Sequence, residues 1–468
     1  MPEPNRPSIF IQSLPWFAAI VCAAAFVFWA ALDAPKQEPK REPIKWDRAA
    51  AKIAAPAEAV TTAGAGVAAA LAGSWPQFRG PNRDNIAETT RPLARSWPAA
   101  GPKLLWRLPV GEGFAGAAIH KGKVYLLDYD RDKAQELIRC LSLNDGREIW
   151  RTAYPLTIKR NHGMTRTVPA VNDRFVVTFS PRCLVYCCDA LTGRVVWKKD
   201  LKAEYAAVEP QWYAGQCPLI DGDRVILAPA GKPLMLAIDL ATGNELWRAP
   251  GHDDMGMTHS SIAPATLGGV KQYLYCANKG AVGVDANTGR VLWTHPWIIK
   301  MATIPAPVPV GGDRVFFTGG YNAGSLMIRL VKDGDAFKTE ELFRLRASEF
   351  SSDQHTPIYY DDKLYATCSP SASGRLKRLD PGGKVAWASD ALEVGLGPML
   401  LTADGLALAL DDHTGTLHLG EIGNDGYKEL ANAKVLDGVE PWAPMALADA
   451  RLILRDMTEM KCYSLEGD

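Results

Sequence analysis

The most reactive side chains in this sequence are its nine cysteines. None of them forms the C-x-x-C pair used by zinc ribbons, thioredoxin-like centres and haem attachment sites. Cys187 and Cys188 are adjacent, and adjacent cysteines could form a redox-active disulfide. Their segment, VYCCDALTG, reads as a strand that leads into a turn, so alternation places the two side chains on opposite faces. We therefore expect two buried thiols rather than a redox site.

Length, composition and charge restrict the class of protein. The chain has 468 residues, more than the ~250–300 that one hydrophobic core usually serves, so a repeat array or several domains is expected. Lys+Arg and Asp+Glu both number 52, and this balance excludes the broad positive field on which nucleic-acid binding depends. The 41 glycines and 33 prolines indicate many turns between short strands.

A turn-and-strand phrase recurs along the chain. Its pattern is Asp-x-x-Thr-Gly-x-x-x-Trp, in which Asp can bond nearby backbone amides and Gly takes the positive φ of a tight turn. The copies are LNDGREIW (143–150), DALTGRVVW (189–197), DLATGNELW (239–247), DANTGRVLW (285–293) and the shorter DPGGKVAW (380–387). A second phrase precedes each copy, as in GDRVILA (222–228), and reads as a turn followed by an alternating strand.

The spacing of the repeated tryptophans sets the number of repeats. They are Trp106, Trp150, Trp197, Trp247, Trp293 and Trp387, with Phe343 and Leu430 at the two remaining steps. Intervals of about 45 residues match the ~40–50 residues of a four-stranded propeller blade. After Leu430 the chain holds only three strands, whereas LLWRLPV (104–110) supplies a spare strand near the start. We therefore predict an all-β, eight-bladed β-propeller over 102–468, with four-stranded antiparallel blades closed by the N-terminal strand.

These repeats resemble the tryptophan-docking repeats of pyrroloquinoline-quinone (PQQ)-type eight-bladed propellers. From about residue 75 onward, including the lead-in SWPQFRGPNRDN (74–85), the chain is similar to PQQ-like repeat proteins related to the outer-membrane-protein assembly factor BamB. The resemblance implies that the repeated tryptophans wedge between neighbouring blades, where each buries up to ~150–250 Å² of ring surface. We expect this structural role for Trp106, Trp150, Trp197, Trp247, Trp293 and Trp387.

Candidate binding residues lie where each innermost strand begins, because these starts surround one mouth of the central channel. Counting from the repeats places ten of them there: Phe114, Arg166, Trp212, Tyr213, Gln216, His259, Ser260, Ser352, His355 and Trp442. Arginine, histidine and tryptophan side chains that converge from several blades could recognise a polar ligand or a peptide. The alternative is that they only fill and hydrate the channel. We predict no catalytic residue and no metal ligand among them.

The N-terminal residues read as a membrane anchor. Residues 14–32 carry no charge, and at ~1.5 Å per residue a helix of this length is about enough to cross a ~30 Å hydrocarbon core. A cleaved signal peptide is the alternative, although Pro35 disfavours cleavage after Ala34. The predicted order is a short tail (1–13), the transmembrane helix (14–32), an Ala/Pro/Lys/Glu-rich linker (33–73), a lead-in segment (74–101) and the propeller (102–468).

Two indications of membrane orientation disagree. Only Arg6 precedes the predicted span, whereas several lysines and arginines follow it, and this distribution would leave the propeller in the cytoplasm. The family resemblance implies the opposite. On that basis we expect a single-pass protein of the bacterial cytoplasmic (inner) membrane with its propeller on the periplasmic side.

The resemblance leads to two functional hypotheses. The preferred one is a membrane-tethered, non-catalytic scaffold of the cell envelope that binds other envelope proteins or peptides, has a monomeric propeller and needs no cofactor. The alternative is a PQQ-dependent quinoprotein dehydrogenase that oxidises an alcohol or a sugar with the help of calcium. Such enzymes hold quinone and Ca²⁺ with carboxylate and amide groups and pass electrons to a haem. The sequence shows neither such a ligand cluster nor a C-x-x-C-H motif. The nearest acidic cluster, His252-Asp253-Asp254, is interpreted as a solvated loop.

Overall fold

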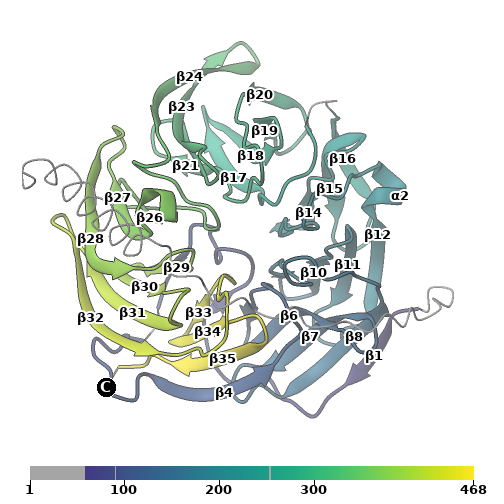
Figure 1. Ribbon diagram of the computed structural model, residues 1–468. Coiled ribbons are helices and arrows are strands. Elements are labelled where there is room, and N and C mark those ends of the chain that lie inside the picture. Colours follow the sequence, from purple (N-terminus) through teal and green to yellow (C-terminus); the bar gives the residue numbers. More distant parts are fainter. Residues whose placement is uncertain (1–57, 90, 252–254, 468) are drawn as a thin grey trace, which may run out of the picture. The chain divides into compact units, whose positions relative to one another are not determined.

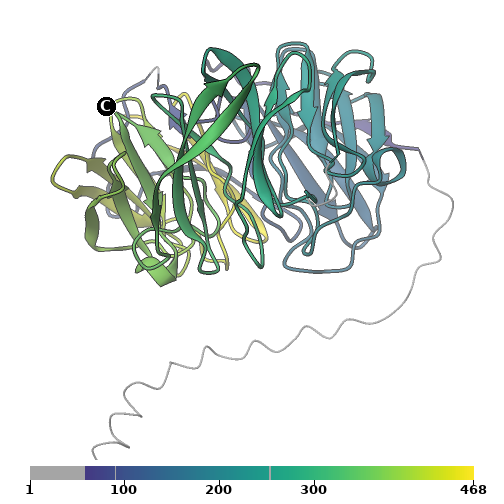
Figure 2. The same ribbon diagram turned by 90° about the horizontal axis from the view of Figure 1, so that it is seen from above.

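A computed structural model describes residues 58–89, 91–251 and 255–467. Eight antiparallel sheets surround a central axis as the blades of a propeller (Figure 1). Seen edge-on, the blades stand side by side around the ring (Figure 2). The predicted all-β, eight-bladed fold is confirmed.

Blades 1 to 7 each contain four consecutive strands that run in order from the innermost to the outermost. Blade 1 is β5 (Ala118–His120), β6 (Lys123–Asp130), β7 (Gln135–Ser142) and β8 (Glu148–Pro155); blade 2 is β9 (Ala170–Val171), β10 (Phe175–Phe179), β11 (Leu184–Asp189) and β12 (Val195–Asp200); blade 3 is β13 (Leu219–Asp221), β14 (Arg224–Leu227), β15 (Pro233–Asp239) and β16 (Glu245–Pro250); blade 4 is β17 (Ala263–Leu267), β18 (Val270–Ala277), β19 (Gly280–Asp285) and β20 (Val291–His295).

The second half of the ring repeats this order. Blade 5 is β21 (Val308–Val310), β22 (Arg314–Gly319), β23 (Gly324–Asp333) and β24 (Ala336–Leu345); blade 6 is β25 (Ile358–Tyr360), β26 (Lys363–Thr367), β27 (Arg375–Leu379) and β28 (Val385–Glu393); blade 7 is β29 (Met399–Thr402), β30 (Leu406–Leu410), β31 (Thr416–Ile422) and β32 (Tyr427–Lys434). Within residues 58–467, apart from the positions left undescribed, two short helices interrupt the strands: α2 (Leu201–Tyr205) and the 3₁₀ turn η1 (Pro370–Ala372). No helix in the described part of the chain is long and apolar enough to span a bilayer.

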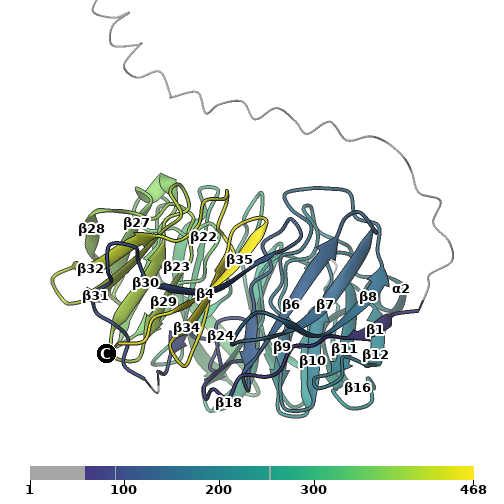
Figure 3. The same ribbon diagram turned by 90° about the horizontal axis from the view of Figure 1, so that it is seen from below.

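Blade 8 joins the two ends of the propeller. Its inner three strands, β33 (Ala446–Ala448), β34 (Arg451–Arg455) and β35 (Glu459–Ser464), come from the C-terminus, and its outer strand is β4 (Lys103–Pro109). β4 lies antiparallel beside β35 (Figure 3). In this pairing Trp106 is opposite Cys462. Without β4, the outer edge of β35 would present unpaired backbone groups. The predicted closure by the N-terminal strand is confirmed.

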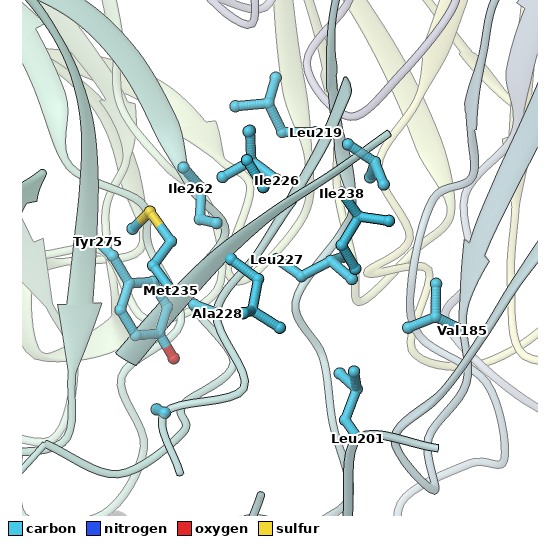
Figure 4. Packing of buried hydrophobic residues seen from close by; sticks show 14 of the residues in the cluster. Val185, Leu201, Leu219, Ile226, Leu227, Ala228, Met235, Ile238, Ile262 and Tyr275 are labelled. Atoms are coloured by element: carbon cyan, nitrogen blue, oxygen red, sulfur yellow. The ribbon is translucent and has the colours of Figure 1, made fainter. Parts of the chain in front are cut away.

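The middle strands are apolar on both faces because each blade is covered by a neighbour on either side. All five residues of β30 are buried, as are the side chains of Val225, Ile226 and Leu227 in β14. Between blades 2 and 4, Ile226, Met235 and Tyr275 belong to one buried cluster (Figure 4). Burying such side chains contributes roughly 1.5–3 kcal/mol each, so the contacts between blades carry much of the stability.

The predicted linker, 33–73, extends too far toward the propeller. Within it, β1 (Val60–Ala63) pairs antiparallel with β8 as an extra outermost strand of blade 1. Gly64 and Gly66 then donate backbone hydrogen bonds to Ile149 and Glu148. A Cβ on Gly64 would lie only 2.0 Å from the Glu148 carbonyl oxygen, so this segment needs glycine for close approach rather than for flexibility. The predicted anchor (14–32) and the linker up to residue 57 lie outside the described residues.

The lead-in segment passes through the inside of the ring. Its strand β2 (Ser74–Trp75) pairs with β5 of blade 1, and its strand β3 (Ile86–Ala87) pairs in parallel with β29 of blade 7. Between them, the buried Arg79 donates hydrogen bonds to the carbonyls of Thr356 (2.6 Å) and Pro357 (2.9 Å) in front of blade 6. The lead-in, seen near the centre of Figure 1, is therefore a plug that ties the inner strands of several blades together.

Most of the repeated tryptophans contact the next blade. Trp150 Nε1 donates to the Ala190 carbonyl (3.3 Å), in the turn that contains the Gly of the next repeat. A Cβ on that glycine, Gly193, would lie 2.4 Å from the Trp150 ring, and its φ is +75°. The turn glycine thus serves both the backbone conformation and the contact between blades. The indoles of Trp106, Trp197, Trp247 and Trp387 make the equivalent hydrogen bonds to the carbonyls of Leu143, Leu240, Ala286 and Gly423.

Trp293 differs from the other repeated tryptophans. Its Nε1 donates to Gln272 Oε1 (2.8 Å) within its own blade. The following blade has no Thr-Gly turn at this point, because its outer strands β23 and β24 extend to a hairpin around Gly334. A Cβ on Gly334 would meet nothing within 4 Å, so no ring packs on that turn. The expected wedge between blades is therefore not formed by the Trp293 indole in the same way.

Cys187 and Cys188 lie on opposite faces of β11. Cys187 belongs to the buried cluster shared with blade 3, and Cys188 to the cluster shared with blade 1. Both are free thiols, and burial raises their pKa, to about 12 for Cys188. Their positions agree with the alternation expected from the sequence, and neither thiol lines the channel-mouth cavity.

Candidate functional site at the channel mouth

A cavity of about 430 Å³ lies at one mouth of the central channel. Every one of the eight connections between blades contributes to its lining, because each connection enters the next innermost strand at this end. Phe78 of the plug also lines the cavity. The exposed side chains of Met301 (57% exposed) and Tyr321 (39%) belong to its lining and place its opening at the surface. Its size is within the ~300–1,000 Å³ of small-molecule sites.

Aromatic rings form much of the wall. Phe114, before blade 1, stacks on Trp442, before blade 8, with ring centroids 5.4 Å apart. The Trp442 indole is fixed by a 2.8 Å hydrogen bond from Nε1 to Asp412 Oδ2. Trp212, before blade 3, lies with its ring centroid 6.4 Å from that of His259. Rings held in this way present flat apolar surfaces that cost little conformational entropy on binding.

The backbone around Trp212 is in an unusual conformation. Trp212 and Tyr213 both have positive φ, +65° and +72°, and Tyr321 has +54°. Bulky residues rarely occupy this left-handed region, since it brings Cβ close to the backbone. Such residues are held there only when the surroundings fix them, and they concentrate at binding sites. The backbone of this loop therefore fixes the direction in which the Trp212 side chain leaves the chain.

Arg166 provides a positive charge in the cavity wall. Its guanidinium donates to three backbone carbonyls, those of Asn161 (3.1 Å), His162 (2.7 Å) and Trp212. The guanidinium carbon lies 5.8 Å from the centroid of the Tyr213 ring. Removal from water lowers the pKa of Arg166 to about 10, and no carboxylate among the described residues forms an ion pair with it. The side chain remains a cation at neutral pH with only dipoles around it.

His259 lies beside Arg166. Gly215 separates them, and a Cβ on Gly215 would lie 3.0 Å from the imidazole of His259 and 3.4 Å from Arg166 Cδ. Removal from water, and then the charge of Arg166, lower the pKa of His259 to about 4. Its Nε2 is buried and has no hydrogen-bond partner among the described residues. A neutral imidazole with one unsatisfied nitrogen therefore stands next to the cation.

The opposite wall carries an acid and a second histidine. The connection before blade 6 holds Asp353 and His355, four blades away from Arg166. His355 Nε2 lies 3.0 Å from the Leu396 carbonyl oxygen, and burial followed by the charge of Arg79 lowers its pKa to about 4. Asp353 accepts a hydrogen bond from Ser369, and burial raises its pKa. The two walls therefore differ in polarity, with the permanent cation on one side only.

The structure brings six of the ten candidate residues into the cavity wall: Phe114, Arg166, Trp212, His259, His355 and Trp442. The other four support the loops. Tyr213 donates from its hydroxyl to the Lys159 carbonyl (2.5 Å), and Gln216 forms hydrogen bonds with both backbone groups of Ala228. Ser260 donates to the Pro305 carbonyl (3.1 Å), and Ser352 to the His355 carbonyl (2.7 Å).

Several lining residues escaped the sequence analysis. Phe78 arrives from the plug, whose path through the ring leaves no periodic signal. Tyr321 comes from the turn between β22 and β23, which reaches the same face as the blade connections. Asp353 and His162 lie in connections that were recognised, but only one or two residues of each were chosen. The short distance from Ser352 to His355 in the sequence was the one signal that could have pointed to Asp353.

The residues present do not fit a quinone–calcium site. Asp353 is the single carboxylate among the described lining residues, whereas Ca²⁺ takes six to eight oxygen ligands, usually from several carboxylate, carbonyl or amide groups. The group Asp411, Asp412 and His413 has the spacing for a metal, but it lies in the turn after β30. There Asp411 caps its own turn, and Asp412 holds the Trp442 indole. The acidic group at 252–254 lies outside the described residues.

Comparisons with known proteins agree with this architecture. A PQQ-repeat family described as outer membrane protein assembly factor BamB matches residues 133–389, more than half of the 468-residue chain. The crystal structure of BamB from Moraxella catarrhalis superposes with a TM-score of 0.54 at 13% identity, covering 78% of this chain and 99% of that one. No curated protein sequence matches significantly.

Quinoproteins share the fold to a similar degree. Quinohemoprotein alcohol dehydrogenase from Comamonas testosteroni gives a TM-score of 0.59 at 12% identity, covering 84% of this chain and 81% of that one. A quinohemoprotein alcohol dehydrogenase from Pseudomonas putida gives 0.54 at 13% identity, with coverages of 85% and 81%. At these identities the similarity concerns the fold alone, and the choice between scaffold and enzyme depends on the residues of the site.

Proposed function

Because this chain belongs to the PQQ-repeat family of the outer membrane protein assembly factor BamB, we propose that it is a membrane-tethered, non-catalytic scaffold of the bacterial cell envelope. Its partners are other envelope proteins or peptides, and its propeller is a monomer that docks them at the channel mouth. In this proposal residues 14–32 anchor the chain in the cytoplasmic membrane and the propeller stands on the periplasmic side.

The observation that carries the proposal is the apolar character of the mouth face. Exposed apolar side chains there include Val208 (70% exposed), Ile298 (60%), Met301 (57%) and Val439 (38%), all from connections between blades. They accompany a cavity walled by Phe114, Trp212 and Trp442. Central aromatic pockets with apolar surroundings are typical of protein-binding surfaces, in which a few anchors supply most of the affinity.

The chemistry of the cavity supports a binding role more than an oxidation. Removing hydrogen from an alcohol requires a base within ~2.6–3.2 Å of the hydroxyl. His259 and His355 have pKa values lowered to about 4, which makes them weak bases, and Asp353 is the single carboxylate of the described lining. The described lining therefore holds no second carboxylate that could bind a metal together with Asp353. The dehydrogenase therefore remains the weaker candidate.

A quinone titration tests the non-catalytic part of the proposal. We expect the melting temperature of the purified protein with PQQ to be the same with and without Ca²⁺, and we expect no oxidation of alcohols or sugars with artificial electron acceptors. Specific cofactor binding would raise the melting temperature through linkage. A calcium-dependent rise of several degrees, together with turnover that Arg166→Ala abolishes, would establish the dehydrogenase instead.

A further inference from the structure

We propose that the channel-mouth cavity binds an aromatic monocarboxylate, with its carboxylate on Arg166 and its ring between the Phe114–Trp442 pair and Trp212. The ligand is either a free aromatic acid or the C-terminal aromatic residue of a peptide, since both present the same groups. This binding site does not require the scaffold role proposed above, and the two can fail separately.

The positive charge of Arg166 has no counter-ion among the described residues, and this favours binding of an anion. Three of its N–H groups are taken by carbonyls, which fixes the plane of the guanidinium without neutralising its charge. A partly buried cation surrounded only by neutral groups is costly, and a carboxylate offers charge-assisted hydrogen bonds to the remaining N–H groups. Arg166 is also the one arginine or lysine among the described lining residues, so a single negative charge is matched.

His259 adds selectivity at the same place. Its buried Nε2 has no partner in the described part of the protein, and Gly215, which has no Cβ, lets this ring and Arg166 pack close together in the cavity wall. A carboxylate that reaches Arg166 also comes close to His259, and the neutral imidazole, in the tautomer with its proton on Nε2, can donate to a carboxylate oxygen directly or through a bridging water. On the far wall, Asp353 disfavours a second carboxylate on the ligand. A polycarboxylate such as PQQ is thus a poorer match than a monocarboxylate.

The aromatic side chains of the cavity wall indicate that the apolar part of the ligand is an aromatic ring. The stacked pair Phe114–Trp442 and the ring of Trp212 come from connections on both sides of Arg166 in the ring of blades, which places flat surfaces next to the charge. Phe78 of the plug adds a further ring. A cavity of about 430 Å³ accommodates one indole or phenyl group with a short acidic chain.

The test uses three probes on the full-length protein in detergent, measured by calorimetry at pH 7. They are N-acetyltryptophan, its neutral amide N-acetyltryptophanamide, and indole-3-propionate. We expect the acid to bind at least about tenfold tighter than the amide, because hydrogen bonds to charged groups are worth roughly ten- to hundredfold in affinity. Tighter binding of N-acetyltryptophan than of indole-3-propionate identifies a peptide terminus as the source, and the reverse a free acid.

A pair of arginine variants locates the site. Arg166 and Arg182 both lie over the Tyr213 ring, at 5.8 and 5.9 Å from its centroid, but only Arg166 lines the cavity. Arg166→Gln should reduce acid binding to the level of the amide, whereas Arg182→Gln should leave the acid preference intact. Equal binding of acid and amide by the wild-type protein, or an unchanged acid preference in a folded Arg166→Gln variant, would overturn the proposal. The wild-type comparison decides it even if Arg166→Gln does not fold.

Discussion

A chain that starts at residue 111 should fail to fold or should aggregate. It lacks β4, and with it the outer strand of blade 8, the backbone pairing with β35 and the Trp106 indole that reaches Leu143. It also lacks the plug, in which Arg79 ties the channel wall together. The loss exposes an unpaired strand edge and opens the apolar cluster that blade 8 shares with blades 1 and 7. Circular dichroism and size-exclusion chromatography would measure the outcome.

The control is a chain that starts at residue 58. It keeps β1, the plug and β4, and should be a soluble monomer with the melting temperature of the full-length protein. A chain that starts at residue 74 should melt a few degrees lower than this control, because it loses β1 and uncovers the edge of β8. A well-folded 111–468 fragment with an unchanged melting temperature would contradict closure by β4.

Replacing Trp150 with alanine should destabilise the propeller by about 3–5 kcal/mol, the usual cost of deleting a buried aromatic side chain. Trp150 is 1% exposed and packs against Gly193 of the next blade. The change therefore leaves a cavity between blades 1 and 2 and also removes the hydrogen bond to Ala190. The free energy of unfolding from denaturant titration gives the measurement.

Trp150→Phe separates packing from the hydrogen bond. The Ala190 carbonyl also accepts from the Tyr125 hydroxyl at 3.1 Å, so it stays satisfied when the indole N–H is removed. The phenylalanine variant should therefore lose only about 1–2 kcal/mol. Ligand affinity at the channel mouth should be the same in both variants when they are folded. If Trp150→Ala kept wild-type stability, the tryptophan would have no structural role between the blades.

The sequence was sufficient for the ring of blades because the signals are local and periodic. Asp189 accepts hydrogen bonds from the amides of Leu191 and Thr192 within one turn, and the same pattern recurs at Asp239 and Asp285. The spare strand at 104–110 could be assigned because the last blade of a closed ring lacked its outermost strand. Where the repeat degenerates, after Trp293, the number of blades was still predicted correctly. Trp293 packs in a cluster with blade 5, but its indole N–H bonds Gln272 of its own blade.

The parts that escaped prediction depend on long-range contacts. The segment around Gly64 has the composition of a flexible linker. Because Gly64 and Gly66 have no Cβ atoms, however, the segment can pack closely against β8. Arg79 and Phe78 carry no periodic signal, because their roles depend on passage through the inside of the ring. The same limit applies to the cavity. The spacing of the repeats located the connections that line the cavity. It could not show which side chain of each connection points inward, because this depends on loop conformations such as the positive φ of Trp212.

The central claim, that envelope proteins dock at the channel mouth, is tested most directly by site-specific photo-crosslinking in native membranes. The full-length protein would carry the crosslinker at Val208 or Val439 on the mouth face, or at Leu191 in a turn on the opposite face; all three positions are exposed. We expect adducts with envelope proteins, identified by mass spectrometry, from Val208 and Val439 but not from Leu191. Adducts of equal yield from both faces, or from Leu191 alone, would contradict docking at the mouth.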